Sequence, residues 1–288
     1  MFRTLISTSD LAARRDDPSW VVVDVRYSLA DTAAGLAQYR ESHIAGAVYA
    51  SLSHDLASAP TGTNGRHPLP APDAMAAAFG RLGIGPGTQV VCYDGDNMFA
   101  ARLWWMLRFL GHDAVAVLDG GFPKWVSEGR PVRAGDEHRS AATFTATVRE
   151  QMRVPVDVVA AASQNGTLRL IDARAPERFE GKNETLDKAA GHIPGAANYF
   201  FKRNFTAEGT IRPAEELRPP LAAATAGKPM SEVVMYCGSG VTACQNLLAL
   251  EHAGLPGARL YVGSWSEWSA DPARPVETGP AKPVRPSS

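Results

Sequence analysis

An internal repeat constrains the fold of this 288-residue chain more than any other feature. Trp20–Arg26 resembles Leu168–Arg174, and His43–Ala47 resembles His192–Ala196. Two further pairs follow in the same order, Val90–Asp94 with Val233–Cys237 and Leu118–Trp125 with Tyr261–Trp268. Because the separation stays at about 145 residues, tandem domains of roughly 120 residues explain the pattern better than short solenoid repeats.

Each copy alternates short apolar runs with segments of helical periodicity. In the first copy, Val21–Val25, Val90–Tyr93 and Ala114–Leu118 are expected to be strands, with helices expected at Ala100–Leu110 and Pro123–Glu128. Continuous apolar strands are typical of parallel sheets that are buried on both faces. The sequence therefore predicts an α/β fold in which each domain has a mainly parallel sheet flanked by helices. Ligands in such folds bind beyond the carboxyl ends of the strands.

The polar stretch after Arg133 shows no helical period and contains Pro155 near its end, so we interpret it as a linker. We expect an N-terminal domain over residues 1–135, a linker over 136–156 and a C-terminal domain over 157–272. The remainder, 273–288, is rich in proline and is expected to be extended or disordered.

Composition argues against several classes of partner. The formal net charge of −1 gives no reason to expect binding to nucleic acid or to an anionic membrane. No run approaches the ~20 apolar residues of a membrane span, and the first residues lack the apolar core of a signal peptide. The three cysteines form no C-x-x-C motif and no cluster with histidine, so neither disulfides nor a metal site is expected. We expect a cytoplasmic protein.

Cys237 is the strongest candidate for chemistry. It follows the apolar run Val233–Tyr236, lies in a Gly-rich turn and precedes a helix-like segment. Backbone N–H groups of such a turn and the N-terminus of a helix both favour an anion. A thiol placed there is expected to act as a nucleophilic thiolate. The alternative is a buried cysteine at the end of a strand.

With this loop and the repeat, the chain resembles the tandem rhodanese-like sulfurtransferases. The resemblance rests on CGSGVTA at residues 237–243, the two H-I-x-G-A turns and G-S-W-x-E-W at residues 263–268. The loop resembles the 3-mercaptopyruvate branch, because the thiosulfate branch carries Arg and Lys where this chain has Gly238 and Ser239. The resemblance implies a catalytically inactive N-terminal domain, in agreement with Asp94 at the position that corresponds to Cys237.

The resemblance also implies roles in the active site. Cys237 would carry the transferred sulfur as a persulfide, and Ser239 would help to move a proton to the pyruvate leaving group. The remaining loop residues, which would surround the persulfide, are Gly238, Gly240, Val241 and Thr242. No cofactor is implied. Ser239 could instead be a turn serine that bonds its own loop.

Two residues outside the loop are further candidates. Arg178, directly before a phenylalanine, corresponds to a donor-binding arginine of the family; the alternative is a surface arginine paired with Glu177 or Glu180. His43 is a possible assistant to Ser239. Since His192 repeats it in the second copy, a structural role in the turn is the alternative.

The sequence departs from the family where a second donor-binding arginine is common. It has Asn183–Ala190 there, and neither Lys182 nor Lys188 aligns cleanly as a substitute.

From the Cys237 loop and the resemblance we predict a sulfurtransferase that moves sulfur from 3-mercaptopyruvate or thiosulfate to a thiol or cyanide, with thioredoxin among the acceptors. A thiosulfate-preferring rhodanese and a non-catalytic binding or sensor module are the alternatives. A cysteine phosphatase would need C-x5-R, and Ala243 stands at the arginine position.

Overall fold

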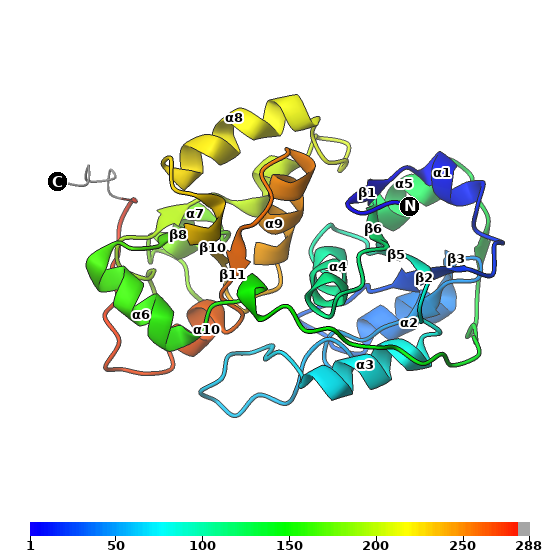
Figure 1. Ribbon diagram of the computed structural model, residues 1–288, viewed down its shortest axis with the longest axis horizontal. Coiled ribbons are helices and arrows are strands. Elements are labelled where there is room, and N and C mark those ends of the chain that lie inside the picture. The colour runs from blue at the N-terminus through cyan, green and yellow to red at the C-terminus, as the bar shows by residue number, and fades with distance from the viewer. Residues whose placement is uncertain (282–288) are drawn as a thin grey trace. The chain divides into compact units, whose positions relative to one another are not determined.

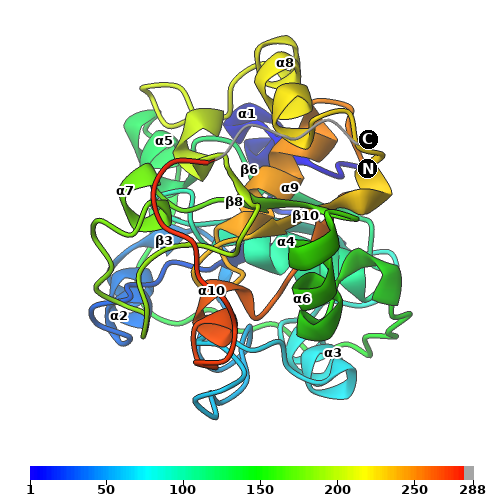
Figure 2. The same ribbon diagram turned by 90° about the vertical axis from the view of Figure 1, so that its left-hand side faces the viewer.

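The computed structural model describes residues 1–281 and divides the chain into two compact units (Figures 1 and 2). Unit 1 contains Met1–Ser58, Leu69–Glu150 and Phe205–Ile211. Unit 2 contains Ala59–Pro68, Gln151–Asn204 and the chain from Arg212 onward. Each unit thus takes one short segment from the other half of the sequence, an exchange that the contiguous boundaries expected above do not include. The segment Ala59–Pro68 supplies part of the candidate site in unit 2.

Unit 1 is built on a five-stranded, fully parallel sheet with the order β1-β6-β5-β2-β4. Its strands are β1 (Leu5–Ile6), β2 (Trp20–Asp24), β4 (Val48–Tyr49), β5 (Gln89–Tyr93) and β6 (Val115–Leu118). A separate antiparallel pair joins β3 (His43–Ile44) to β7 (Val132–Arg133). All five residues of β2 and of β5 are buried, which explains why these strands are apolar throughout.

Helices cover both faces of this sheet. They are α1 (Thr8–Ala12), α2 (Ala34–Glu41), α3 (Pro72–Arg81), α4 (Ala100–Phe109) and α5 (Gly121–Ser127). One core cluster joins Val22 and Val91 to Leu11 of α1 and Trp125 of α5. On the other face α4 packs against β5 and β6, as Figure 1 shows.

Unit 2 repeats this plan with a four-stranded parallel sheet in the order β11-β10-β8-β9. Its strands are β8 (Arg169–Asp172), β9 (Ala197–Asn198), β10 (Val233–Tyr236) and β11 (Arg259–Leu260). The order matches β6-β5-β2-β4 of unit 1, so the sequence repeat corresponds to a repeated sheet. The predicted α/β fold with mainly parallel sheets is confirmed.

The helices of unit 2 lie on both faces of its sheet. They are α6 (Val156–Asn165), α7 (Pro176–Phe179), α8 (Ala214–Thr225), α9 (Ala243–His252) and α10 (Ser264–Trp268), with short 3-10 turns at Glu150–Met152, Phe201–Asn204 and Met230–Glu232. Val234 and Tyr236 share a core cluster with Val159 of α6 and Trp265 of α10. Figures 1 and 2 show α8 and α9 on the opposite side of the sheet. Alternate residues of β10 therefore face different helices, as the strand period requires.

The linker and the start of the tail are held by hydrogen bonds. Ala142 N–H donates to the Gly80 carbonyl, and Val154 N–H donates to the Leu260 carbonyl, both at 2.9 Å. Glu277 pairs with His192 in an antiparallel bridge, much as Arg133 pairs with His43 in unit 1. Residues through Glu277 therefore complete unit 2. The tail that was expected to be extended or disordered covers residues 273–288, and its last part, residues 282–288, lies outside the described residues. In residues 1–281 no helix has both the length and the apolar character needed to cross a membrane.

Candidate active site

Cys237 stands at the carboxyl end of β10, as predicted, and contacts with α10 fix its backbone. The Cys237 N–H donates to Ser264 Oγ at 3.1 Å. In return, Trp265 N–H donates to the Cys237 carbonyl at 2.9 Å and Ser266 N–H to the Gly238 carbonyl at 2.8 Å. The cysteine is only 2% exposed.

The loop turns sharply at Gly240. Its φ is +72°, and a Cβ there would lie 2.2 Å from the Val262 carbonyl oxygen, so no other residue fits. Thr242 is the N-cap of α9, and its carbonyl accepts from Gln245 N–H at 3.1 Å. The loop therefore passes directly into a ten-residue helix, whose N-terminal N–H groups favour an anion.

Ser239 forms a hydrogen bond with a histidine that sequence reasoning missed. Ser239 Oγ lies 2.8 Å from His67 Nδ1, and the two side chains are 7% and 8% exposed. His67 belongs to the segment Ala59–Pro68, and 172 residues separate the pair in sequence. A polar residue in a Gly- and Thr-rich loop carries no signal that ties it to Cys237, so only the fold reveals the contact.

Two guanidinium groups lie over the first peptide of the loop. A Cβ at Gly238 would lie 2.8 Å from Arg66 Nη2 and 3.6 Å from both Nη atoms of Arg178. The structure thus places Arg178 beside Gly238, the residue after Cys237, and adds Arg66. Sequence reasoning missed Arg66 for the same reason as its neighbour His67. Lys182 and Lys188 are exposed. Arg66, not a lysine, is the second cation at the site.

Two buried carboxylates hold these arginines. Glu184 accepts from Arg178 Nη2 at 2.8 Å, and Asp187 Oδ2 accepts from the same nitrogen at 3.0 Å. Asp187 Oδ1 pairs with Arg66, and Glu184 also pairs with Arg174. Both acidic side chains are 2% exposed. These contacts differ from the pairing with Glu177 or Glu180 that was the alternative for Arg178.

The pKa of Arg66 reports how closely these charges are packed. Burial lowers it most, and the positive charge of Arg178 lowers it further. The Cys237 thiolate and Glu184 act in the opposite direction. The positive charges of Arg66 and Arg178 therefore lie close to each other.

His43 lies in β3. It belongs to unit 1, is completely buried, and its Nδ1 lies 2.7 Å from the Tyr39 carbonyl oxygen. His192 makes the same 2.7 Å contact with the carbonyl of Phe179 in unit 2. Because both copies use the histidine in this way, the geometry supports the structural alternative for His43, and His67 is the histidine that contacts Ser239.

The other two cysteines are buried. Cys92 lies in β5, and burial raises the pKa of its thiol well above the usual range. Cys244 Sγ donates to the Gly240 carbonyl at 3.4 Å in the first turn of α9. Among residues 1–281 no group of three or more His, Cys, Asp or Glu side chains could hold a metal ion.

Unit 1 shows what the same loop holds without a cysteine. Asp94, at the position of Cys237, is 1% exposed. Its carboxylate accepts N–H groups from Asn97 at 2.7 Å, Phe99 at 2.7 Å and Ala100 at 2.8 Å. Burial raises its pKa and these hydrogen bonds act in the opposite direction. The corresponding positions of unit 2 are Gly240, Thr242 and Ala243.

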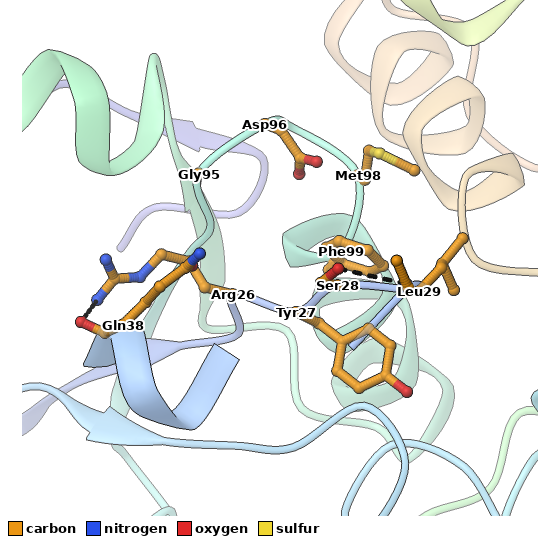
Figure 3. A pocket seen from close by; sticks show the side chains of 10 residues that line it. Arg26, Tyr27, Ser28, Leu29, Gln38, Gly95, Asp96, Met98 and Phe99 are labelled. Atoms are coloured by element: carbon orange, nitrogen blue, oxygen red, sulfur yellow. Dashed lines mark hydrogen bonds between the residues drawn. The ribbon is translucent and has the colours of Figure 1, made fainter. Parts of the chain in front are cut away.

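A cavity of about 550 Å³ lies beside this loop in unit 1 (Figure 3). Gln38 lines it at the position that corresponds to Arg178, because each residue precedes the aromatic residue whose carbonyl contacts the repeated histidine. Arg26, which also lines it, is neutralised by Asp24 at 2.6 Å. This cavity therefore has neither the thiol nor the pair of guanidinium groups found beside Cys237.

Comparisons with known proteins agree with this architecture. A family model described as rhodanese-like domain matches residues 7–128 and 155–271. The chain is 44% identical to the "Probable 3-mercaptopyruvate sulfurtransferase" of Pseudomonas aeruginosa, over 96% of this chain and 98% of that protein. It is 34% identical to thiosulfate/3-mercaptopyruvate sulfurtransferase 2 of Arabidopsis thaliana, over 94% of this chain and 86% of that protein.

A solved structure extends the likeness to three dimensions. The structure of SseA from Escherichia coli, described as a 3-mercaptopyruvate sulfotransferase, is similar with a TM-score of 0.79 and 32% identity. The match covers 92% of this chain and all of that one. The chain therefore belongs to the rhodanese-like family, contains two copies of its domain, and is a sulfurtransferase.

Proposed function

We propose that this sulfurtransferase takes sulfur from 3-mercaptopyruvate onto Cys237 and passes it to a thiol or to cyanide. The proposal is supported by the position of Cys237 between the end of β10 and the N-terminus of α9. It is also supported by unit 1, where three N–H groups of the corresponding loop converge on an anion at the same position. A persulfide is likewise anionic, so this cradle suits both the thiolate and its product.

In the first step the Cys237 thiolate attacks the sulfur of 3-mercaptopyruvate. A sulfur–sulfur bond forms and the bond from sulfur to carbon 3 breaks, which leaves the electron pair on pyruvate as its enolate. The enolate then takes a proton. In the second step the acceptor attacks the outer sulfur, and the Cys237 thiolate is regenerated. The two displacements together need no external oxidant or reductant.

The hydrogen bond between His67 and Ser239 is the observation that most favours 3-mercaptopyruvate as donor. Ser239 stands two residues beyond the nucleophile, and in this proposal it and His67 deliver a proton to the enolate. Sulfite, the leaving group from thiosulfate, needs no proton on carbon. A buried relay of this kind would therefore serve the keto acid and be of little use with thiosulfate.

Arg178 is assigned to the carboxylate of the donor. A guanidinium presents two parallel N–H groups that match a carboxylate, and Arg178 lies over the loop at Gly238. Gly238 and Ser239 themselves carry no charge, and the arginines nearby are neutralised by Glu184 and Asp187. A singly charged keto acid fits this balance better than the thiosulfate dianion.

Steady-state kinetics with both donors tests this assignment. We expect a higher kcat/KM with 3-mercaptopyruvate than with thiosulfate when cyanide is the acceptor. Arg178→Gln, which introduces the residue of unit 1, should raise KM for 3-mercaptopyruvate by about ten- to a hundredfold, the cost of a charge-assisted hydrogen bond. A higher kcat/KM with thiosulfate would instead support a thiosulfate-preferring rhodanese.

A non-catalytic binding or sensor module is the alternative of another class. It would keep the loop but show no turnover with either donor. For the physiological acceptor we propose a small protein thiol of the thioredoxin kind, and for the compartment a reducing one such as the cytoplasm. The support is that Cys92, Cys237 and Cys244 form no disulfide.

A further inference from the structure

We propose that Asp187 is a built-in competitor for the donor's anionic group: its carboxylate bridges Arg66 and Arg178 over the Cys237 loop, and the donor displaces it to reach the sulfur. The inference rests on the proposed function, because it concerns the same donor site. It assigns Arg66 as the second guanidinium of that site and Asp187 as the residue that sets how tightly anions bind there.

The first observation is the bridge itself. Asp187 Oδ1 pairs with Arg66, and Asp187 Oδ2 accepts from Arg178 Nη2 at 3.0 Å. One carboxylate thus occupies both guanidinium groups, in the arrangement that a donor carboxylate would need. With Asp187 in place, the two arginines cannot offer their full set of donors to a second anion.

The second observation is that the nucleophile is covered. Cys237 is 2% exposed, and the two guanidinium groups lie within 2.8 and 3.6 Å of where a Cβ of Gly238 would stand. Release of Asp187 would free the side chain of Arg66, whereas Arg178 would stay bound to Glu184 through Nε and Nη2. The incoming anion would then pair with both guanidinium groups in place of Asp187.

The third observation is that Asp187 lies in a segment without helix or strand, residues 182–190. The start of this segment is tied by Lys182 N–H to the Glu177 carbonyl at 2.9 Å. Its end is tied by Trp265 Nε1 to the Ala189 carbonyl at 2.9 Å. The exposed side chain of Leu186 stands between these anchors. Within the segment, Leu186 N–H and Asp187 N–H donate to Glu184 Oε1 at 2.9 and 3.2 Å. The displacement in this proposal is therefore a rotation of the Asp187 side chain that leaves the backbone of the segment and the sheet in place.

A purely structural role for Asp187 and the proposed competition with the donor predict opposite effects of its removal on anion binding. If Asp187 only positioned the arginines, its removal would leave them misplaced and weaken anion binding. If Asp187 competes with the donor, its removal strengthens anion binding. The sign of the change therefore separates the two roles.

The test compares the alkylation of Cys237 by iodoacetate and by iodoacetamide. The reagents share one leaving group and differ in charge, so the ratio of their rates measures how well the site receives a carboxylate. In Asp187→Asn we expect this ratio to rise about tenfold, equivalent to one charge-assisted contact. In Arg66→Gln we expect it to fall by a similar factor. KM for 3-mercaptopyruvate should fall in Asp187→Asn.

The control is Glu216→Gln, which also removes one carboxylate but from an exposed pair with Arg212 on α8. It should leave the ratio unchanged. An unchanged or lower ratio in Asp187→Asn, with wild-type thermal stability, would overturn the inference. Asp187→Ala, measured in the same way, serves if the asparagine variant does not fold. Because alkylation needs no sulfur transfer, the inference can fail while Cys237 still forms a persulfide, and it can hold if no persulfide forms.

Discussion

The loop after β5 in unit 1 and the loop after β10 in unit 2 have the same backbone plan and opposite uses. Both follow a buried central strand and lead directly into a helix, α4 or α9. In unit 1 the first residue, Asp94, fills the ring of N–H groups with its own carboxylate. In unit 2 the first residue is Cys237, and arginines lie over the next residue. The same loop thus follows the central strand of both sheets, and its first residue is a carboxylate that accepts three N–H groups in unit 1 and a thiol in unit 2.

The largest expected effect is on turnover, when Cys237 is replaced by the aspartate that unit 1 has at this position. Cys237→Asp should lower turnover by at least about 10³-fold, because no nucleophile remains. If the backbone cradles are equivalent, the new carboxylate accepts the N–H groups of Gly240, Thr242 and Ala243. The variant should then melt at a higher temperature than Cys237→Ser. A lower melting temperature than Cys237→Ser would show that the two cradles differ.

Two buried histidines differ in their partners: His67 contacts the Ser239 hydroxyl, whereas His43 of unit 1 contacts a backbone carbonyl. His67→Gln should lower kcat with 3-mercaptopyruvate by about 10²-fold, the usual size of a lost proton relay, with a much smaller loss with thiosulfate. His43→Gln, the control, should lower the melting temperature and keep kcat. Equal losses with both donors would mean that His67 supports the loop without moving a proton.

Asp94→Asn tests how much the hydrogen bonds to the Asp94 carboxylate stabilise unit 1. An amide has one acceptor oxygen for three N–H donors, so the free energy of unfolding should fall by about 1–3 kcal/mol, measured by urea denaturation. Turnover should stay within about twofold of wild type, since Asp94 lies in the unit without a nucleophile. Wild-type stability would show that the charge at this position contributes nothing.

The smallest expected effect is on the pH dependence of stability, through the buried side chain of His192. Burial lowers the pKa of His192 below 6.5, while the contact with the Phe179 carbonyl and nearby carboxylates act against this shift. The unfolded state therefore binds more protons below about pH 6.5, and the free energy of unfolding should fall as the pH drops through that range. His192→Gln should flatten this slope by under about 1 kcal/mol between pH 7.5 and 5.5. A slope unchanged by the substitution would assign the effect to other groups.

Features that depend on local sequence pattern could be predicted from the sequence. Apolar runs predicted the buried strands, and the repeat predicted two similar sheets. The turn around Cys237 also follows from local residues, because Gly240 permits the close approach to Val262. Arg178 was identified through its place before Phe179. These features need no knowledge of distant contacts.

What the sequence did not show depends on segments that pack far from their neighbours in the chain. Arg66 and His67 reach the Cys237 loop because Ala59–Pro68 belongs to unit 2. Nothing local in that segment signals the exchange. The contact of the His43 ring with the Tyr39 carbonyl is likewise visible only in the folded structure. The ion pairs of Asp187 and Glu184 with the arginines of the site could likewise be seen only in the folded structure.

Mass spectrometry of the protein after incubation with donor tests the central claim most directly. After exposure to 3-mercaptopyruvate and removal of excess donor, the peptide that contains Cys237 should gain the mass of one sulfur. The peptide with Cys92 should gain none, and Cys237→Ser should show no gain at all. A sulfur found on Cys244, or no gain with either 3-mercaptopyruvate or thiosulfate, would contradict the account.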